Sequence, residues 1–347
     1  MSAGVAAYAG LDRLGPALSQ ALDDDRWIEA TATLVAGGKS NLTFEVECAA
    51  GAVILRRPPG GDLLPSAHDM GREARVQRAL QGTAVPVARV LLEDDGGLIG
   101  APLYVMEKVV GHSIREHLPL GYAERPEDKV ALADGLIDAL AALHEVDPNQ
   151  VGLADFGRPH GYLERQVRRW SDQWSRSKTH DVAAVTELSA RLAKRVPTAE
   201  RTSIVHGDYR LDNCMMDLDD PARVRAVLDW EMSTLGDPLT DLALMLLYWR
   251  EPSDRRFRLT PAITQVPGFP GRRHLVERYE QKTGRPVENL AFYEAFAHYK
   301  FAVIAQGIAA RVAADAMAGQ QFGDLDAEVR LIAEEGLERL ERHERED

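Results

Sequence analysis

The chain has few cysteines, no block of positive charge and no long hydrophobic run. Its 347 residues include two cysteines, Cys48 and Cys214, too few for a disulfide framework or a four-ligand zinc site. Lysine and arginine total 41 against 54 aspartate and glutamate, which gives a net charge of -13, and no segment is rich in lysine or arginine. This charge balance argues against nucleic-acid binding and leaves small ligands open.

The beginning of the chain and its apolar runs argue against secretion and membrane insertion. The first residues lack the basic start and continuous apolar stretch of a secretory signal, and apolar runs such as 242–249 are far too short to cross a bilayer. We therefore expect a cytoplasmic protein without a membrane partner. Low-complexity tracts and fixed-period repeats are absent, and the composition, 45% hydrophobic and 27% charged, predicts one large or two fused folded domains.

Strand-like segments dominate the first hundred residues, and helical patterns dominate the rest. Alternating or apolar runs in 27–55, 85–94 and 101–110 predict an antiparallel sheet, with a helix at 68–80. Amphipathic helical segments follow at 128–146, 162–175, 181–195, 239–250, 290–315 and 324–345. The sequence thus predicts an α+β fold of two lobes, a small antiparallel β-sheet lobe at 1–108 and a larger, mainly helical lobe at 109–347.

The stretch "IVHGDYRLDNCMMD" (204–217) crowds polar side chains between two apolar runs. Asp208 and Asn213 are five positions apart, and Asp229 follows sixteen residues later at the end of a strand-like run. Kinases use this spacing, since the first Asp takes the proton of the acceptor hydroxyl while the Asn and the last Asp offer oxygen ligands to magnesium. We therefore predict that Asp208 is the catalytic base and that Asn213 and Asp229 bind Mg2+. Any one of them alone would be read as a turn-capping residue.

Neighbouring polar residues receive structural assignments. We expect His206 to bond a backbone group or to brace Asp229, and Asp212 to be a turn or surface residue. Asp241 should cap the helix that follows and brace the polar turn. Only twelve positions separate Asp229 from Asp241, so the long segment with which protein kinases dock peptides is missing, and a small-molecule acceptor is favoured.

A phosphate-covering turn is predicted upstream. In "AGGKSN" (36–41), Gly37 and Gly38 allow close backbone approach, and Ser40 completes a hairpin lid over phosphates; an ordinary hairpin turn is the alternative. A Walker A loop is excluded, because Thr33 stands where that motif needs glycine and a strand-like run follows instead of a helix.

A phosphate clamp and an adenine contact complete the predicted nucleotide site. Arg56 occupies the position of the kinase strand lysine, although a register slip of one residue would turn Arg57 inward instead. Glu73 is its expected ion-pair partner, with a solvated helix charge as the alternative. Backbone groups from Glu107 to Val109, between the lobes, are expected to hydrogen-bond adenine.

The motifs "HGDYRLDN", "VLDWE" and "LGDPLTDLA" resemble the aminoglycoside phosphotransferase-like (choline kinase-like) family, over residues 27–315. More narrowly, "GGKSNLTFEV", "LRRPPGGDLLPSAHDMGREARV" and "GYLERQVRRW" resemble the branch whose kinase domain is associated with acyl-CoA dehydrogenases. This resemblance implies a protein kinase-like fold and the use of ATP and Mg2+, with the site roles given above. It also implies transfer to a hydroxyl of a small molecule, for which we expect a hydroxyacyl-CoA or a hydroxy acid.

Other functions stay open at this point. An aminoglycoside acceptor is polycationic and should meet carboxylates, whereas 164–170, Lys300 and Arg311 place cations in the helical lobe. Alternatively, the arginines within 164–170 (Arg165, Arg168 and Arg169) form a solvated helix face. A non-catalytic nucleotide-binding scaffold for an acyl-CoA dehydrogenase partner is a second alternative. A true dehydrogenase finds little support, because no long helical flavin domain is evident.

Overall fold

The chain forms two compact units in a computed structural model that describes residues 8–35, 41–59, 69–199, 201–314 and 322–343. The first unit combines Met1–Gly111 with Arg225–Ser233, and the second combines His112–Val224 with Thr234–Asp347. The segment that carries Asp229 therefore folds with the N-terminal part of the chain. Each unit is described by itself below.

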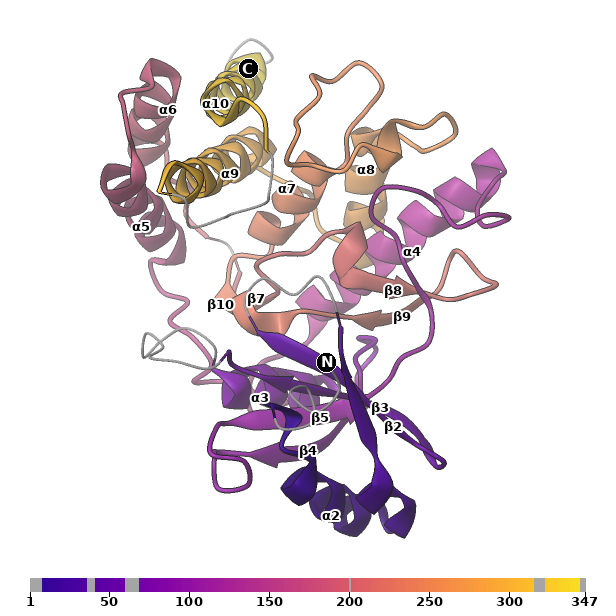
Figure 1. The fold of residues 1–347 in the computed structure, drawn as a ribbon. Helices are drawn as coiled ribbons and strands as arrows, with labels where there is room; N and C mark the ends of the chain where they lie inside the picture. Colours follow the sequence, from indigo (N-terminus) through magenta and orange to yellow (C-terminus); the bar gives the residue numbers. More distant parts are fainter. Residues whose placement is uncertain (1–7, 36–40, 60–68, 200, 315–321, 344–347) are drawn as a thin grey trace. The chain divides into compact units, whose positions relative to one another are not determined.

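An antiparallel sheet of strand order β1-β2-β3-β5-β4 forms the centre of the first unit (Figure 1). Its elements are α2 (Leu11–Leu22), a 3-10 turn (Asp25–Glu29), β1 (Thr31–Leu34), β2 (Leu42–Cys48), β3 (Gly51–Arg57), α3 (Met70–Leu80), β4 (Val90–Asp94), β5 (Leu103–Glu107) and a 3-10 turn (Trp230–Met232). Strand β9 (Val224–Val227) leads the chain back into this unit.

Alternation along the strands decides which helix each face of this sheet meets. On one face, residues such as Phe44 and Leu55 pack with Leu14 and Leu18 of α2. On the other face, Tyr104 and its neighbours pack with Met70 and Ala74 of α3. Because successive side chains of a strand point to opposite faces, each residue of β3 is assigned to one helix or the other by its position alone.

The second unit is mainly helical. Its elements are β6 (His112–Ser113), α4 (Pro126–Glu145), α5 (Tyr162–Ser177), α6 (Ala183–Lys194), β7 (Ser203–Val205), a 3-10 turn (Leu211–Asn213), β8 (Cys214–Met216), β10 (Thr234–Gly236), α7 (Leu239–Tyr248), a 3-10 turn (Ile263–Gln265), α8 (Arg272–Thr283), α9 (Leu290–Ala313) and α10 (Leu325–His343). Strand β7 pairs with β10, and β6 pairs with β8, so short ladders flank residues 206–213.

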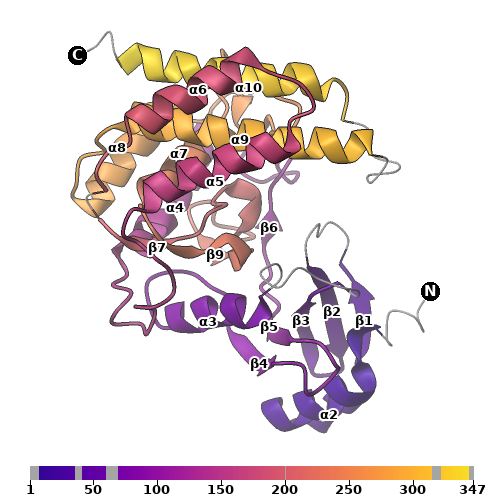
Figure 2. The same cartoon turned by 90° about the vertical axis from the view of Figure 1, so that its left-hand side faces the viewer.

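Helix α9 lies at the centre of this unit, with α10, α5 and α6 beside it (Figure 1; Figure 2). Its buried residues join those of the other helices in one large apolar cluster, which includes Trp170, Leu188, Phe296 and Val329. Within the described ranges, no helix combines the length and the apolar character needed to cross a bilayer.

The sequence patterns did not predict two of the helices, α8 and α2. Helix α8 is strongly polar, and only Arg272, Leu275 and Tyr279 of its residues are buried, so its apolar stripe is too thin to give a clear helical period. Its end is marked instead by Gly284, which has φ 66° at the C-cap. For the segment of α2, the sequence was compared only with a secretory signal, and no helix was predicted there. The remaining helical segments agree with expectation to within a few residues.

Candidate functional site

Residues 206–213, between β7 and β8, form a turn that helices of the second unit hold from three sides. The Tyr209 hydroxyl donates to the Leu136 carbonyl of α4 at 2.7 Å. Lys300 of α9 donates through Nζ to the Gly207 carbonyl at 2.7 Å. Asp241 of α7 accepts the Gly207 N–H at 2.8 Å. We call this segment the 206–213 turn; groups that are far away in sequence hold it.

Asp208 and Asn213 meet inside this turn. Asn213 donates through Nδ2 to the backbone carbonyl of Asp208 at 2.8 Å and to its carboxylate Oδ2 at 3.0 Å. The Asn213 side chain is buried, and the Asp208 side chain is 30% exposed. The amide group therefore sets the direction of a carboxylate that solvent, and hence a ligand, can reach.

Asp241 braces the turn, as expected, but does not cap its helix through its side chain. Its carboxylate accepts the N–H of His206 at 2.5 Å and lies 3.4 Å from Nε2 of the buried His144. Burial opposes ionisation, yet the bond from the neighbouring His144, the proximity of His206 and the Gly207 N–H hold the pKa of Asp241 below its usual value. Asp241 is thus a buried carboxylate. His206 accepts the Asp208 N–H at Nδ1, 3.3 Å away, which confirms the expected backbone contact.

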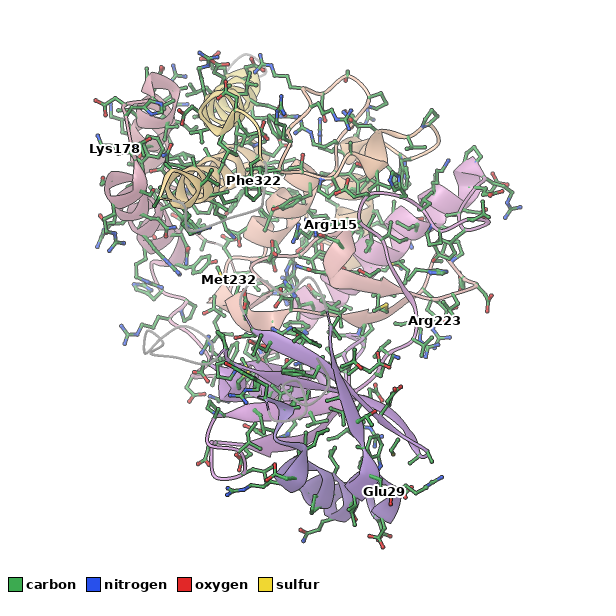
Figure 3. The ribbon with its side chains drawn as sticks, viewed as in Figure 1. Glu29, Arg115, Lys178, Arg223, Met232 and Phe322 are labelled. Atoms are coloured by element: carbon green, nitrogen blue, oxygen red, sulfur yellow. The ribbon has the colours of Figure 1, made fainter. Side chains whose placement is uncertain are left out.

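Asp212 lies in a turn, which was one of the two expected places, and not on the surface. Its side chain is only 12% exposed, and its Oδ2 lies 3.1 Å from Nη1 of Arg210. Arg115, labelled in Figure 3, approaches the same carboxylate oxygen to 4.0 Å. Burial raises the pKa of Asp212, an effect that Arg210 opposes.

Arg210 was missed altogether, although it stands inside the motif. Its Nε lies 3.3 Å from Oδ2 of Asp208, and its guanidinium group covers the ring of Tyr248 at 4.9 Å. Lys300 adds a second cation to the same turn, and burial lowers its pKa, although Asp208 and Asp241 oppose this. Two cations therefore stand close to the carboxylate of Asp208.

In the first unit, Arg56 joins two acidic side chains. Its Nη2 lies 3.1 Å from Oε2 of Glu73 and 3.2 Å from Oδ1 of Asp229. The predicted ion pair with Glu73 is therefore present. Asp229 has φ 64°, a left-handed conformation uncommon for a residue with a side chain, and stays 37% exposed. Arg57 points to the opposite face and donates to the backbone carbonyls of Pro58 and Tyr8.

Glu73 is enclosed by donors that the sequence did not reveal. The Tyr104 hydroxyl donates to Oε2 at 3.0 Å and accepts from Gln77 at 3.1 Å, and Asn41 donates to Oε1 at 2.7 Å. Burial raises the pKa of Glu73 to about 7, although Arg56 and the Tyr104 hydroxyl act in the other direction. The alternation of β5 brings Tyr104 to the face of Arg56, as the register Arg56 to Tyr104 shows.

The segment expected to contact adenine lies at the end of β5. The Glu107 N–H donates to the Arg89 carbonyl at 2.9 Å, and Val109 packs against the apolar cluster on the α3 side of the sheet. Adenine binding by this segment stays a prediction. Gly37, Gly38 and Ser40 lie outside the described residues.

Asn213 and Asp229 fit the chemistry of magnesium. Among the described residues, no group of three or more His, Cys, Asp and Glu side chains is placed to hold a metal by itself. Magnesium in phosphoryl-transfer sites is bound by one or two protein oxygens together with substrate phosphates. The Asn213 amide, whose Nδ2 is engaged by Asp208, keeps a carbonyl oxygen for such a role, and Asp229 offers a carboxylate.

An antiparallel N-terminal sheet followed by a helical part is the kinase-like fold of the aminoglycoside phosphotransferases. The chain belongs to the phosphotransferase enzyme family, whose sequence model matches residues 31–275. A Ralstonia eutropha protein described as an aminoglycoside phosphotransferase has a solved structure that is 34% identical, with a TM-score of 0.79 over 90% of this chain and 93% of that one. Aminoglycoside phosphotransferase APH(4)-Ia, solved with ADP and hygromycin B, shares the fold at 15% identity, with a TM-score of 0.60 over 94% of this chain and 98% of that one.

The curated relatives with similar sequences are named as acyl-CoA dehydrogenase family members and not as phosphotransferases. Acyl-CoA dehydrogenase family member 10 of Mus musculus is 36% identical over 305 residues, which cover 85% of this chain and 28% of the mouse protein. Across this protein and the family member 11 relatives from rat and chicken, the chain spans 28% to 39% of their length. The similarity therefore concerns one part of much longer proteins.

Proposed function

We propose that this protein transfers the γ-phosphoryl group of ATP, with Mg2+, to a hydroxyl of a small molecule, and that the acceptor is a hydroxyacyl-CoA or a hydroxy acid. One observation carries the proposal. The Asp208 carboxylate is aligned by Asn213 on a turn that α4, α7 and α9 hold still, which is the rigid support that a general base requires.

Each site residue has a role in this proposal. Asp208 takes the proton of the acceptor hydroxyl while the hydroxyl oxygen attacks the γ-phosphorus, and ADP leaves. Arg56, oriented by Glu73, holds phosphate oxygens, a task for which a planar guanidinium is suited. Asn213 and Asp229 would hold magnesium, which neutralises phosphate charge when bound. Gly37, Gly38 and Ser40 would cover the phosphates, and backbone groups from Glu107 to Val109 would contact adenine.

The charge around Asp208 favours an anionic acceptor. Arg210, which also pairs with Asp212, lies 3.3 Å from the Asp208 carboxylate, and Lys300 bonds the neighbouring carbonyl. These two cations offset the charge of the two carboxylates, which a polycationic aminoglycoside would need unpaired. The phosphate and carboxylate groups of hydroxyacyl-CoAs and hydroxy acids fit these cations. The names of the acyl-CoA dehydrogenase relatives point toward acyl-CoA chemistry as well.

The test is an ATP-consumption assay with hydroxyacyl-CoAs, hydroxy acids and aminoglycosides as acceptors. Asp208→Ala should lower turnover by about 100-fold to 10,000-fold, the usual loss when a general base is removed. Asp219→Ala is the matched control, because Asp219 is exposed and lies in the turn after β8. Unchanged turnover in Asp208→Ala would refute the assignment of the base.

The same assay distinguishes the alternative functions. Turnover only with aminoglycosides would replace the proposed acceptor class. Stabilisation by ATP without turnover of any acceptor would favour a nucleotide-binding scaffold, for which an acyl-CoA dehydrogenase partner is the candidate.

A further inference from the structure

The second unit contains a cavity of about 280 Å³ that the proposed phosphotransfer does not use. The end of α8 and the beginnings of α7 and α9 line it, with Tyr279, Leu239 and Tyr293 among its walls and Arg201 and Arg285 nearer the solvent. We propose that this cavity is a second ligand site, which takes a small carboxylate or phosphate anion and acts on the 206–213 turn through Tyr279.

Two arginines of the lining offer donors to an anion. Arg201 and Arg285 share a single carboxylate, Glu145; Arg201 is bonded to it, and Arg285 remains 3.9 Å away with its side chain 53% exposed. The buried Asp237 is already engaged, because the Leu239 N–H donates to its Oδ1 at 3.0 Å and the Tyr293 hydroxyl to its Oδ2 at 2.8 Å.

The remaining acidic side chain of the lining, Glu288, is exposed. The guanidinium of Arg285 is therefore the donor best placed to receive an entering anion.

The size and the apolar walls limit the ligand further. Pro238, Leu239 and Pro286 supply apolar surface beside the two tyrosine rings. A volume of this size is at the lower end of small-molecule sites. A short aliphatic carboxylate or a small phosphate fits these properties, and a nucleotide would be too large.

A chain of buried hydrogen bonds connects the cavity to the 206–213 turn. The Tyr279 hydroxyl lies 2.7 Å from Nδ1 of His144, whose Nε2 lies 3.4 Å from Oδ2 of Asp241. Asp241 is a carboxylate that can only accept, so in the neutral imidazole of His144 the proton is assigned to Nε2, and Tyr279 donates to Nδ1. Asp241 in turn holds the backbone N–H groups of His206 and Gly207, directly before Asp208.

Tyr279 is therefore the residue through which a bound ligand reaches the turn. An anion that draws the Tyr279 hydroxyl toward the cavity removes the donor from His144 and loosens the hold of His144 on Asp241. The hydrogen bonds can carry the effect, because Tyr279, His144 and Asp241 are all buried and are bonded in sequence. The effect of the bound ligand on turnover rests on the proposed phosphotransfer, whereas the binding of the ligand to the cavity does not.

The binding test uses calorimetry with butyrate, inorganic phosphate and the uncharged butyramide as probes. We expect butyrate or phosphate, but not butyramide, to bind, and Arg285→Gln to weaken that binding about tenfold, the loss of one charge-assisted contact. The probe that binds tells carboxylate from phosphate. Arg273→Gln, an exposed α8 substitution of the same charge change, should leave binding unchanged. Failure of both anions, equal binding of butyramide, or equal loss in Arg273→Gln would overturn the proposal.

The coupling test follows the imidazole nitrogens of His144 by NMR. The bound probe should shift the His144 signals in the wild type, and in Tyr279→Phe it should bind within about threefold of wild type yet no longer change the rate of phosphotransfer. A missing His144 shift, or an unaltered rate effect in Tyr279→Phe, would refute the coupling. If no acceptor is phosphorylated at all, the proposed function fails. Probe binding and the His144 shift still show whether the cavity is an anion site coupled to His144.

Discussion

Arg56 and Arg57 are neighbours in the chain, yet their surroundings differ completely. Arg56 faces α3 and contacts Glu73 and Asp229, whereas Arg57 faces the other side of the sheet and bonds backbone carbonyls. The pairing of β3 with β5, which sets Arg56 beside Tyr104, decides between them. Although burial opposes a charged guanidinium, the acidic groups around Arg56, with Tyr104, raise its pKa, so it stays charged throughout the physiological range.

Arg56→Lys should raise the KM for ATP about tenfold, because an ammonium group cannot reproduce the forked contact of a guanidinium with two oxygens. Arg57→Lys, the adjacent substitution on the opposite face, is the control and should leave that KM unchanged. The measurement is initial-rate kinetics at varied ATP. An equal rise in the KM for ATP in both variants would show that Arg56 does not contact the phosphates of ATP.

At the scale of the element, α4 approaches a turn of the chain so closely that one of its residues must be glycine. A Cβ on Gly135 would lie 2.7 Å from the carbonyl carbon of Ala222 and closer still to its oxygen. Backbone cannot yield as a flexible side chain can. The same helix supplies the Leu136 carbonyl to Tyr209, so the close approach of α4 also places the 206–213 turn.

Gly135→Ala should therefore lower the free energy of unfolding by about 1 to 3 kcal/mol, the usual penalty for overpacking, despite the higher helix propensity of alanine. Gly307→Ala in α9 is the matched control, because among the described residues its Cβ would meet only the end of the Arg311 side chain, at 3.9 Å. That control should gain about 0.5 to 1 kcal/mol from helix propensity. Urea denaturation measures both, and a stabilised Gly135→Ala variant would disprove the close contact.

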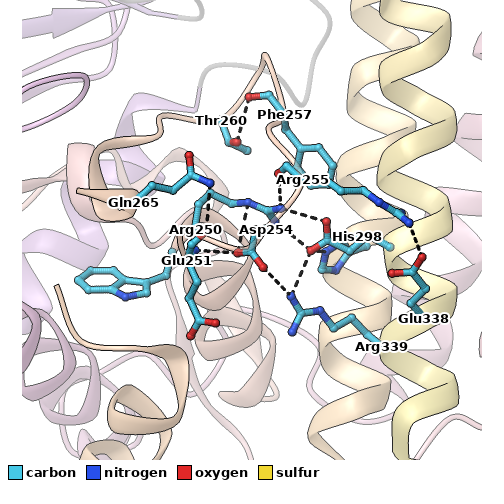
Figure 4. A network of polar contacts seen from close by, with 12 residues as sticks. Arg250, Glu251, Asp254, Arg255, Phe257, Thr260, Gln265, His298, Glu338 and Arg339 are labelled. Carbon is cyan, nitrogen blue, oxygen red and sulfur yellow. Dashed lines mark hydrogen bonds and ion pairs between the residues drawn. The ribbon is translucent and has the colours of Figure 1, made fainter. Parts of the chain in front are cut away.

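At the scale of the whole second unit, a buried polar network joins α10 to the segment after α7 (Figure 4). Arg250 binds Glu335 through two contacts at 3.0 and 3.1 Å, and Asp254 is held by Arg272 at 2.6 and 2.8 Å. Burial opposes ionisation of Glu335, but His298 and Arg250 hold its pKa well below the usual range. Arg272 does the same for Asp254, against its burial.

This network makes the protein sensitive to acid. A carboxylate with a lowered native pKa stabilises the fold above its usual pKa, 4.5 for Glu335, and that stability is lost as pH falls further, since the unfolded chain binds the proton first. Thermal unfolding should therefore show a steep loss of stability below this pH in the wild type. In Glu335→Gln, stability should be lower at neutral pH, and its decline with acid shallower.

Glu338→Gln provides the control on the same helix, because Glu338 is 45% exposed and pairs with Arg255 near solvent. Its acid profile should match that of the wild type. If Glu335→Gln declined as steeply as the wild type, the acid loss would have to arise elsewhere in the chain.

The sequence by itself determined which residues we propose for the site and the type of most elements. The spacing of Asp208, Asn213 and Asp229, the alternation along β2, β3 and β5, and the amphipathic periods of the long helices are local properties, which side-chain order along the chain expresses directly. These patterns predicted an α+β fold with a small sheet lobe and a helical lobe, and the resemblance to the phosphotransferase family implied the kinase-like fold. Polar α8 was not predicted, because its burial depends on neighbours that a local period does not contain.

Only the tertiary structure decided how the site is held. Leu136, Asp241 and Lys300 meet the 206–213 turn from helices that lie far from it in sequence, and Asp229 joins Arg56 across 173 positions of the chain. The burial of Asp212, the role of Tyr104 beside Glu73 and the cavity beside Tyr279 have the same origin. Such contacts arise from packing between distant segments, and no local pattern records them.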